Sequence, residues 1–207
     1  MICLDLETAP FRNADILTNE RILAIAIAKR ESENSIDIKS WLLEEDSDEG
    51  EYKLLEKFNN DLTPEPLVVI GYGIRDYDIP LLAIKMKRYD PEITSVKERM
   101  PKVKKLWHII NLLERAVHID LMTRFRFELK TSGFDELLDY KEFFSLPLKR
   151  IKHPPPQGKT LGEYMYELWK ERPEEVRTLV ESHVHDMLLI TEYWSLKIRK
   201  SSSKYSV

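Results

Sequence analysis

The chain has one cysteine, Cys3, and only 6 glycines among its 207 residues. A single cysteine excludes an internal disulfide framework, and the apolar neighbours of Cys3 predict a small buried hydrophobic residue. The near absence of cysteine fits a reducing compartment, so we expect a cytoplasmic protein.

Long hydrophobic runs are also missing. The longest apolar stretches, at residues 22–28 and 66–70, are far shorter than the roughly 20 residues that span a bilayer. Asp5 and Glu7 interrupt the apolar segment at the N terminus, so no secretory signal is predicted. We therefore expect no interaction with membranes.

The chain has no excess of basic residues, since 32 Lys and Arg face 36 Asp and Glu, for a net charge of −4. This balance argues against a nonspecific polyanion binder, whose domain pI usually exceeds about 9. It does not exclude a nuclease, because a carboxylate site adds negative charge that its metal ions cancel. Basic residues gather in two groups: Lys85, Lys87, Arg88, Lys97, Arg99, Lys102, Lys104 and Lys105, and then Lys149, Arg150, Lys152 and His153. Either group could line a phosphate path or form a solvated helix face.

Five segments have the pattern of β-strands, at residues 1–7, 21–29, 35–43, 67–71 and 117–121. The first alternates apolar and other residues, as a strand with two different faces does. The continuous apolar run at 67–71 is typical of a strand buried on both faces. The polar stretch at 30–34 predicts a turn, so the first three strands should form an antiparallel meander.

Helices are predicted at residues 51–62, 78–89, 96–116 with a break at Pro101, 133–144, 160–171 and 173–198. The second has an acidic first residue, Asp78, and Pro80 in its first turn, a common helix start. The order of elements predicts an α/β fold: a mixed five-stranded sheet, with an antiparallel meander plus parallel strands and helices on both faces. We expect a single domain over residues 1–199 and a frayed C-terminal tail over 200–207.

Two carboxylates stand in the first strand. Asp5 and Glu7 are two positions apart, so both leave the same face of the strand, about 6.6 Å apart. They are the only charged residues in an otherwise apolar strand, where carboxylates are unfavourable without a partner. Oxygen ligands on a rigid strand form a suitable platform for divalent cations.

Two further acids occupy informative places. Asp78 follows a glycine-containing loop after the buried strand, and sites in α/β sheets gather at such strand ends. Its alternative role is that of a plain helix N-cap. Asp186 lies inside a predicted helix among apolar residues, where an aspartate is a poor helix former. If it is buried it needs a partner or a metal ion, and the alternative is that it faces solvent.

Three motifs occur in order: Ile-Cys-Leu-Asp-Leu-Glu-Thr at 2–8, Gly-Tyr-Gly-Ile-Arg-Asp-Tyr-Asp-Ile-Pro-Leu-Leu at 71–82, and Ser-His-Val-His-Asp-Met-Leu-Leu at 182–189. They resemble the three exonuclease motifs of the DEDD (DnaQ-like) 3'→5' exonuclease superfamily. The similarity is closest to the exonuclease domain of family B DNA polymerases and to the stand-alone predicted exonucleases related to it. Segments 118–121 and 133–138 resemble that family too, so the resemblance runs from Met1 to about Trp194 and implies a ribonuclease H-like fold.

The resemblance implies a metal-dependent 3'→5' exonuclease that removes nucleoside 5'-monophosphates from the 3' end of DNA, with single-stranded DNA as the expected substrate. Two Mg²⁺ or Mn²⁺ ions, about 3.5–4 Å apart, would be bound by four acids. These are Asp5, Glu7, Asp78 and Asp186. A protein partner in replication or repair is a further expectation.

The resemblance also names candidate substrate-binding residues. Thr8 follows the carboxylate pair as it does in the family, and would contact the terminal nucleotide. Tyr77 and Phe11 are candidates for stacking on bases. Packing in the core is the alternative for both aromatic residues.

The chain departs from the family pattern at two places. The family usually has Asn where this chain has Gly73. The family also places a Tyr four residues, or a His five residues, before the last acid, where this chain has Ser182 and Glu181. A serine hydroxyl can hydrogen-bond a water but is a poor base, so Ser182 is a candidate substrate-binding residue.

His183 is the candidate replacement for the missing base, since it shares a helix face with Asp186 and titrates near neutral pH. Packing at the rim of the cleft is its alternative role. Two other functions therefore stay open. One is a catalytically weak or inactive nucleic-acid-binding module on the same fold, accessory to repair or replication, and the other is an exonuclease acting on RNA or short oligonucleotides.

Overall fold

The computed structural model describes residues 1–10, 20–62, 68–89, 106–130 and 133–202. Its centre is a five-stranded sheet with the strand order β3-β2-β1-β4-β5. The strands are β1 (Ile2–Pro10), β2 (Glu20–Ser32), β3 (Ser35–Leu42), β4 (Val68–Gly71) and β5 (Val117–Asp120). The first three pair antiparallel, whereas β4 and β5 run parallel to β1. This confirms the predicted mixed α/β sheet, which is consistent with a ribonuclease H-like fold.

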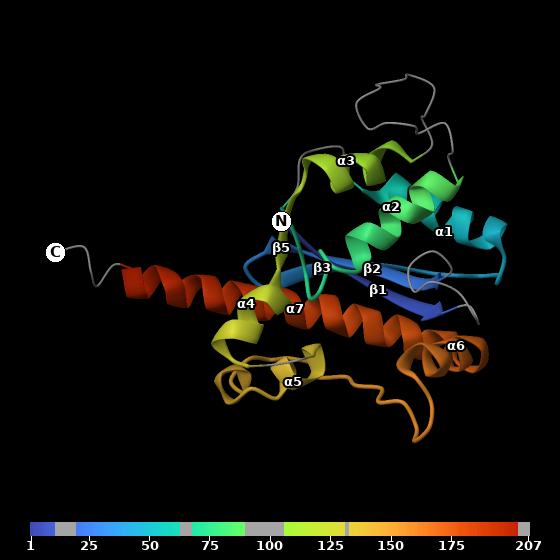
Figure 1. The fold of residues 1–207 in the computed structure, drawn as a ribbon. Helices are drawn as coiled ribbons and strands as arrows, with labels where there is room; N and C mark the ends of the chain where they lie inside the picture. The colour runs from blue at the N-terminus through green and yellow to red at the C-terminus, as the bar shows by residue number, and fades with distance from the viewer. Residues whose placement is uncertain (11–19, 63–67, 90–105, 131–132, 203–207) are drawn as a thin grey trace.

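Three helices cover one face of the sheet (Figure 1). They are α1 (Asp48–Asp61), α2 (Asp78–Tyr89) and α3 (Trp107–Arg115). Helix α1 begins earlier than predicted because the Ser47 side chain accepts a hydrogen bond from the backbone N–H of Gly50. The first part of the helix predicted at 96–116 lies outside the described residues.

The long helix α7 (Pro173–Ser202) crosses the opposite face, with α6 (Leu161–Glu171) beside its N-terminal end (Figure 1). Helix α6 starts with a capping box formed by Thr160 and Glu163. Helix α7 continues to Ser202, past the start of the predicted tail at residue 200. Within the five described stretches, no helix combines the length and the apolar character that crossing a bilayer requires.

The segment between β5 and α6 differs from the prediction. Helix α4 (Leu121–Glu128) was not expected, and it forms because Asp120 caps it by accepting from the backbone N–H groups of Met122 and Thr123. The single helix predicted at 133–144 is instead the short α5 (Phe134–Leu138) followed by a 3-10 turn, η1 (Lys141–Phe143). The break lets Phe143 enter the core, where its ring contacts Phe125 and Trp194.

A buried ionic network joins β2, α1 and α2. Glu51 is fully buried and accepts hydrogen bonds from the Ile22 backbone at 2.7 Å, from Lys85 at 2.9 Å and from Arg21 at 3.0 Å. A buried carboxylate requires such partners. The suggestion that Lys85 lines a phosphate path is therefore wrong, because its ammonium group lies inside the protein.

Candidate functional site

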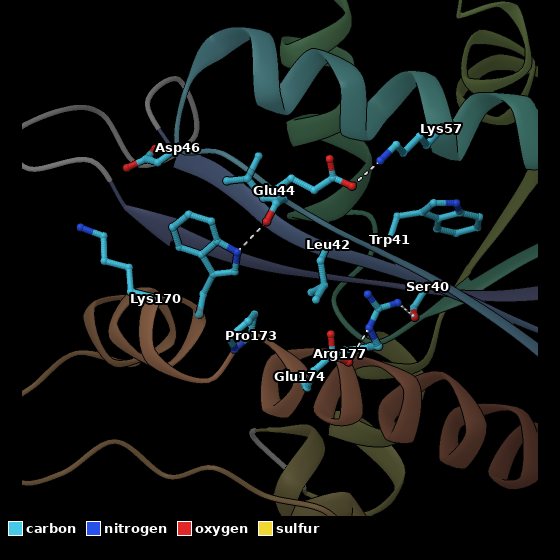
Figure 2. Close-up of a pocket in the computed structure, with 12 residues that line it drawn as sticks. Ser40, Trp41, Leu42, Glu44, Asp46, Lys57, Lys170, Pro173, Glu174 and Arg177 are labelled. Atoms are coloured by element: carbon cyan, nitrogen blue, oxygen red, sulfur yellow. Dashed lines mark hydrogen bonds and ion pairs between the residues drawn. The ribbon is translucent and has the colours of Figure 1, made fainter.

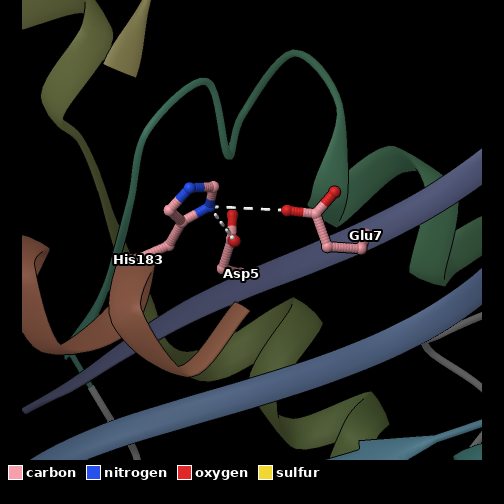
Figure 3. A group of neighbouring side chains, drawn as sticks. All are labelled: Asp5, Glu7 and His183. Atoms are coloured by element: carbon pink, nitrogen blue, oxygen red, sulfur yellow. Dashed lines mark hydrogen bonds and ion pairs between the residues drawn. The ribbon is translucent and has the colours of Figure 1, made fainter. Parts of the chain in front are cut away.

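The carboxyl ends of three neighbouring strands meet at one edge of the sheet. Asp5 and Glu7 lie in β1, the loop after β4 leads to Asp78 at the start of α2, and Asp120 ends β5. Helix α7 passes along the same face as the β1 acids and adds His183 (Figure 3). The position matches the strand-end location that sequence motifs indicated.

Asp5, Glu7 and His183 form a compact cluster. The His183 Nδ1 atom lies 3.0 Å from Asp5 Oδ2 and 3.4 Å from Glu7 Oε1 (Figure 3). One donor atom of each side chain lies within 4.8 Å of the others, a spacing that could hold a metal ion. All three side chains are mostly buried, so their charges act on one another with little screening by water.

Asp78 stands beside this cluster, close enough for the charges of Asp5 and Glu7 to act on its carboxyl group. The residue is 4% exposed, and its side chain makes no hydrogen bond or ion pair within the described residues. Burial raises the pKa of Asp78 well above its ordinary value, and the charges of Asp5, Glu7 and Asp120 raise it further. Such a carboxyl group is unfavourable unless a proton or a cation neutralises it.

Glu7 has a similar environment. Burial raises the pKa of Glu7, the hydrogen bond from His183 lowers it, and the charge of Asp5 raises it again. A further contribution comes from Asp135 in the first turn of α5, which also raises the Glu7 pKa. Asp135 was not among the predicted site residues, although it belongs to segment 133–138, which resembles the exonuclease family.

His183 supplies the positive charge of the cluster. Burial lowers its pKa, but hydrogen bonds and charges from Asp5 and Glu7 outweigh burial and raise the pKa to about 10. At neutral pH the ring is therefore an imidazolium between two carboxylates. Its Nε2 atom is buried and has no hydrogen-bond partner among the described residues, and the ring packs edge-on against Phe134 at 5.2 Å.

Asp186 is not a member of this cluster in the structure. Its carboxylate accepts hydrogen bonds from the backbone N–H groups of Lys149 and Arg150, both at 2.9 Å, and lies 2.8 Å from His185 Nδ1. Asp186 is fully buried, so these contacts compensate its desolvation. Of the two candidates on α7, it is His183 that joins Asp5 and Glu7.

The predicted substrate-binding residues have different positions. The Thr8 hydroxyl lies 2.6 Å from the Tyr77 hydroxyl and donates to Glu20 at 3.1 Å, so Thr8 and Tyr77 flank the acids. Ser182 is buried and donates to the Leu179 carbonyl inside α7. Phe11 lies outside the described residues.

Asp120 holds the loop that leads to Asp78. Its carboxylate accepts from the backbone N–H groups of Gly73 at 3.0 Å and Arg75 at 3.1 Å, in addition to capping α4. Gly73 has φ 75°, in the left-handed region that glycine and asparagine adopt most readily. This backbone suits glycine as well as asparagine, the residue at this position in the exonuclease motif that the sequence resembles. Sequence reasoning did not assign Asp120 to the site, although an acid at the end of a strand was the available signal.

A separate hollow of about 630 Å³ lies between β3 and the junction of α6 with α7 (Figure 2). Two ion pairs lie in its wall, between Lys57 and Glu44 and between Arg177 and Glu174. The Trp169 ring donates to the Leu43 carbonyl at 2.8 Å. The hollow contains none of the clustered site acids.

No protein-family model and no curated protein matches the chain. Among solved structures, the chain is similar to the family B DNA polymerase from the hyperthermophilic archaeon Pyrobaculum calidifontis, with a TM-score of 0.54 and 16% sequence identity. The match covers 93% of this chain but 24% of the polymerase chain. At this identity the similarity shows a shared fold and not a shared activity. The fold of this protein therefore occurs within a family B DNA polymerase.

Proposed function

We propose that the protein is a divalent-metal-dependent 3'→5' exonuclease that acts on single-stranded DNA ends. The observation that carries the proposal is the grouping of the largely buried Asp78 with Asp5 and Glu7, whose charges raise its pKa further. A protein gains little stability from grouping three acids in this way, so their placement supports the proposal of a cation site.

The donor set fits Mg²⁺ or Mn²⁺. Asp5, Glu7 and Asp78 offer carboxylate oxygens, which are the ligands that these hard cations prefer. When bound, the cations would supply positive charge to the phosphate and make an attacking water more acidic. His183 would border the cations and could contribute a nitrogen only after losing its proton.

The surrounding residues would position the substrate. Thr8 and Tyr77, joined by their hydroxyl groups at 2.6 Å, flank the acids and would contact the terminal nucleotide. The raised pKa of His183 makes the free residue a proton donor at neutral pH and not a base. It could act as a base only if cation binding between Asp5 and Glu7 lowered that pKa.

A second candidate is a nucleic-acid-binding module without catalysis. Two observations favour it: the His183 imidazolium lies where a cation would bind, and Asp186 is engaged by the backbone of another segment. The two functions differ in their need for metal, because a binding module should tolerate EDTA and a nuclease should not.

The test is degradation of a 5'-labelled single-stranded DNA with Mg²⁺ or Mn²⁺, with an RNA of the same sequence in parallel. We expect products that shorten from the 3' end and that disappear with EDTA, Asp5→Ala or Asp78→Ala. Glu49→Ala, which removes an exposed acid on α1, is the matched control and should keep activity. If neither metal supports cleavage while the oligonucleotide still binds, the module without catalysis is the correct function.

A further inference from the structure

A basic segment lies below α7, on the side away from the sheet (Figure 1). Residues 141–159 contain five lysine or arginine residues and one acid in a protein whose net charge is −4. The basic residues are Lys141, Lys149, Arg150, Lys152 and Lys159. The exonuclease chemistry proposed above uses none of them.

The two ends of this part of the chain are fixed next to the candidate site. At one end, Phe134 packs against His183 at 5.2 Å. At the other, the backbone N–H groups of Lys149 and Arg150 bind Asp186, which is three residues after His183 and so about 4.5 Å farther along the helix axis. The segment from Phe134 to Arg150 therefore begins and ends close to the acids.

Within this segment an aromatic ring and a guanidinium group are presented together. Phe144 is 60% exposed, and the Arg150 guanidinium lies 5.7 Å from the centre of its ring. That guanidinium donates to the carbonyl oxygens of Leu138 at 3.2 Å and Phe143 at 2.6 Å, so it is held in place. These contacts preorganise an aromatic ring with a positive charge over one of its faces.

Among the described residues, no carboxylate pairs with the side chains of the two cations next to Phe144. Within the described part of the chain, neither Lys149 nor Arg150 makes an ion pair with a carboxylate, whereas Lys152 pairs with Asp139. A polyanion would provide the missing negative charge. An exposed phenylalanine beside a guanidinium also favours a ligand with flat faces that can stack.

We propose that Phe144, Lys149 and Arg150 form a binding surface for single-stranded nucleic acid next to the candidate site. A base would stack on Phe144, while Lys149 and Arg150 would contact phosphates of the same strand. Asp186 is the positioning residue for this surface, because it holds the backbone that carries both cations. The inference rests on the proposed exonuclease function. It adds a binding surface for the part of the strand that continues from the reacting end.

The test measures binding without cleavage. Fluorescence anisotropy with a 5'-fluorescein-labelled single-stranded oligothymidylate in EDTA compares the wild-type protein with Phe144→Ala and Lys149→Ala. We expect Phe144→Ala to raise Kd roughly 5- to 100-fold, the range for loss of one stacked base. Lys149→Ala should reduce the slope of log K against log salt concentration by about 0.7, the value for one phosphate contact on a single strand.

Phe127→Ala is the matched control, since Phe127 is 82% exposed and belongs to α4, outside the segment from Phe134 to Arg150. It should bind like the wild-type protein, and thermal unfolding should show that all variants fold. The inference fails if Phe144→Ala and Lys149→Ala bind as the wild type does, if Phe127→Ala weakens binding equally, or if the wild-type protein does not bind.

The same experiment separates this inference from the exonuclease proposal. If binding depends on Phe144 but no cleavage occurs in Mg²⁺ or Mn²⁺, the exonuclease proposal is wrong and the binding-surface proposal stands. If Phe144→Ala cleaves DNA with the wild-type KM and binds it with the wild-type Kd, the exonuclease proposal stands and the binding-surface proposal is wrong. Asp5→Ala should abolish cleavage and still bind the oligonucleotide in EDTA.

Discussion

The Nδ1 atom of His183 lies 3.0 Å from the carboxylate of Asp5, although 178 positions separate the two residues in the sequence. The same atom lies 3.4 Å from the carboxylate of Glu7. In the metal-free protein the protonated His183 ring is therefore the cation between these two carboxylates. The histidine therefore competes with any divalent ion for the same two carboxylates, and this competition can be measured.

The stability of the metal-free protein should fall as pH rises. The folded-state pKa of His183 is about 10 against an ordinary value of 6.5, so its contribution is full below pH 6.5 and lost as pH approaches 10. The pKa values of Asp78 and Glu7 are raised as well, so their ionisation also disfavours folding as pH rises. Thermal unfolding in EDTA between pH 6 and pH 10 should show a falling Tm. His183→Gln should flatten the dependence, and a Tm that rises over this range would contradict the assignment.

Metal affinity should show the opposite trend. Binding of Mn²⁺ requires the acids to be ionised and displaces the His183 proton, so protons are released and Kd decreases as pH rises. Isothermal titration calorimetry in buffers of different ionisation enthalpy would measure the number of protons released. Binding with no proton release would show that the cation does not occupy the space between Asp5 and Glu7.

Asp78→Asn should separate stability from metal binding. The amide removes a buried ionisable group, so the metal-free variant should have a higher Tm than the wild type at pH 8. The increase in Tm that Mn²⁺ produces in the wild-type protein should be lost. Asp76→Asn changes an exposed acid in the same loop and should retain the wild-type response to Mn²⁺. Equal responses in both variants would remove Asp78 from the metal site.

Asp186→Ala should act mainly on stability. The substitution removes a buried charged acceptor from two partly buried backbone N–H groups, which should destabilise the protein by about 3 kcal/mol. Denaturant unfolding measures this effect, and the Mn²⁺ affinity should decrease far less than in Asp5→Ala. Loss of Mn²⁺ binding with unchanged stability would instead make Asp186 a metal ligand, as the exonuclease motif implies.

Asp120 should support activity without contacting the substrate. Asp120→Ala releases the backbone of Gly73 and Arg75, and with it the loop that orients Asp78. We expect a 10- to 100-fold loss of metal affinity, the usual range for a residue that orients ligands. Asp120→Asn keeps one acceptor oxygen and should recover part of the loss. If the asparagine and alanine variants bind Mn²⁺ as the wild type does, the loop does not depend on Asp120.

Much of the fold could be predicted because strand signals are local. The alternation in β1, the apolar run of β4 and the helix start at Asp78 each depend on neighbouring residues, and the five predicted strands are present. Helix α4 could not be recognised in the same way, because its cap, Asp120, also ends a strand. The break between α5 and η1 depends on the distant partners of Phe143.

The site was harder to predict on α7 than on β1. On a strand, a separation of two positions fixes Asp5 and Glu7 on one face. On a helix, His183 and Asp186 share a side but differ by about 60° in direction. His183 meets the acids of β1, whereas Asp186 accepts hydrogen bonds from the backbone of Lys149 and Arg150, more than 30 positions earlier in the sequence. The motif indicated the correct turn of the helix but could not show that His183 faces the acids.

The meeting of the first strand with the last helix has a consequence for folding. A site that closes a loop of 178 residues cannot form from local contacts, so its geometry should appear only when the sheet and α7 have assembled. A cation bound there would link β1 and α7 noncovalently. By mass action, each increase in its concentration would shift the population away from states in which α7 has detached.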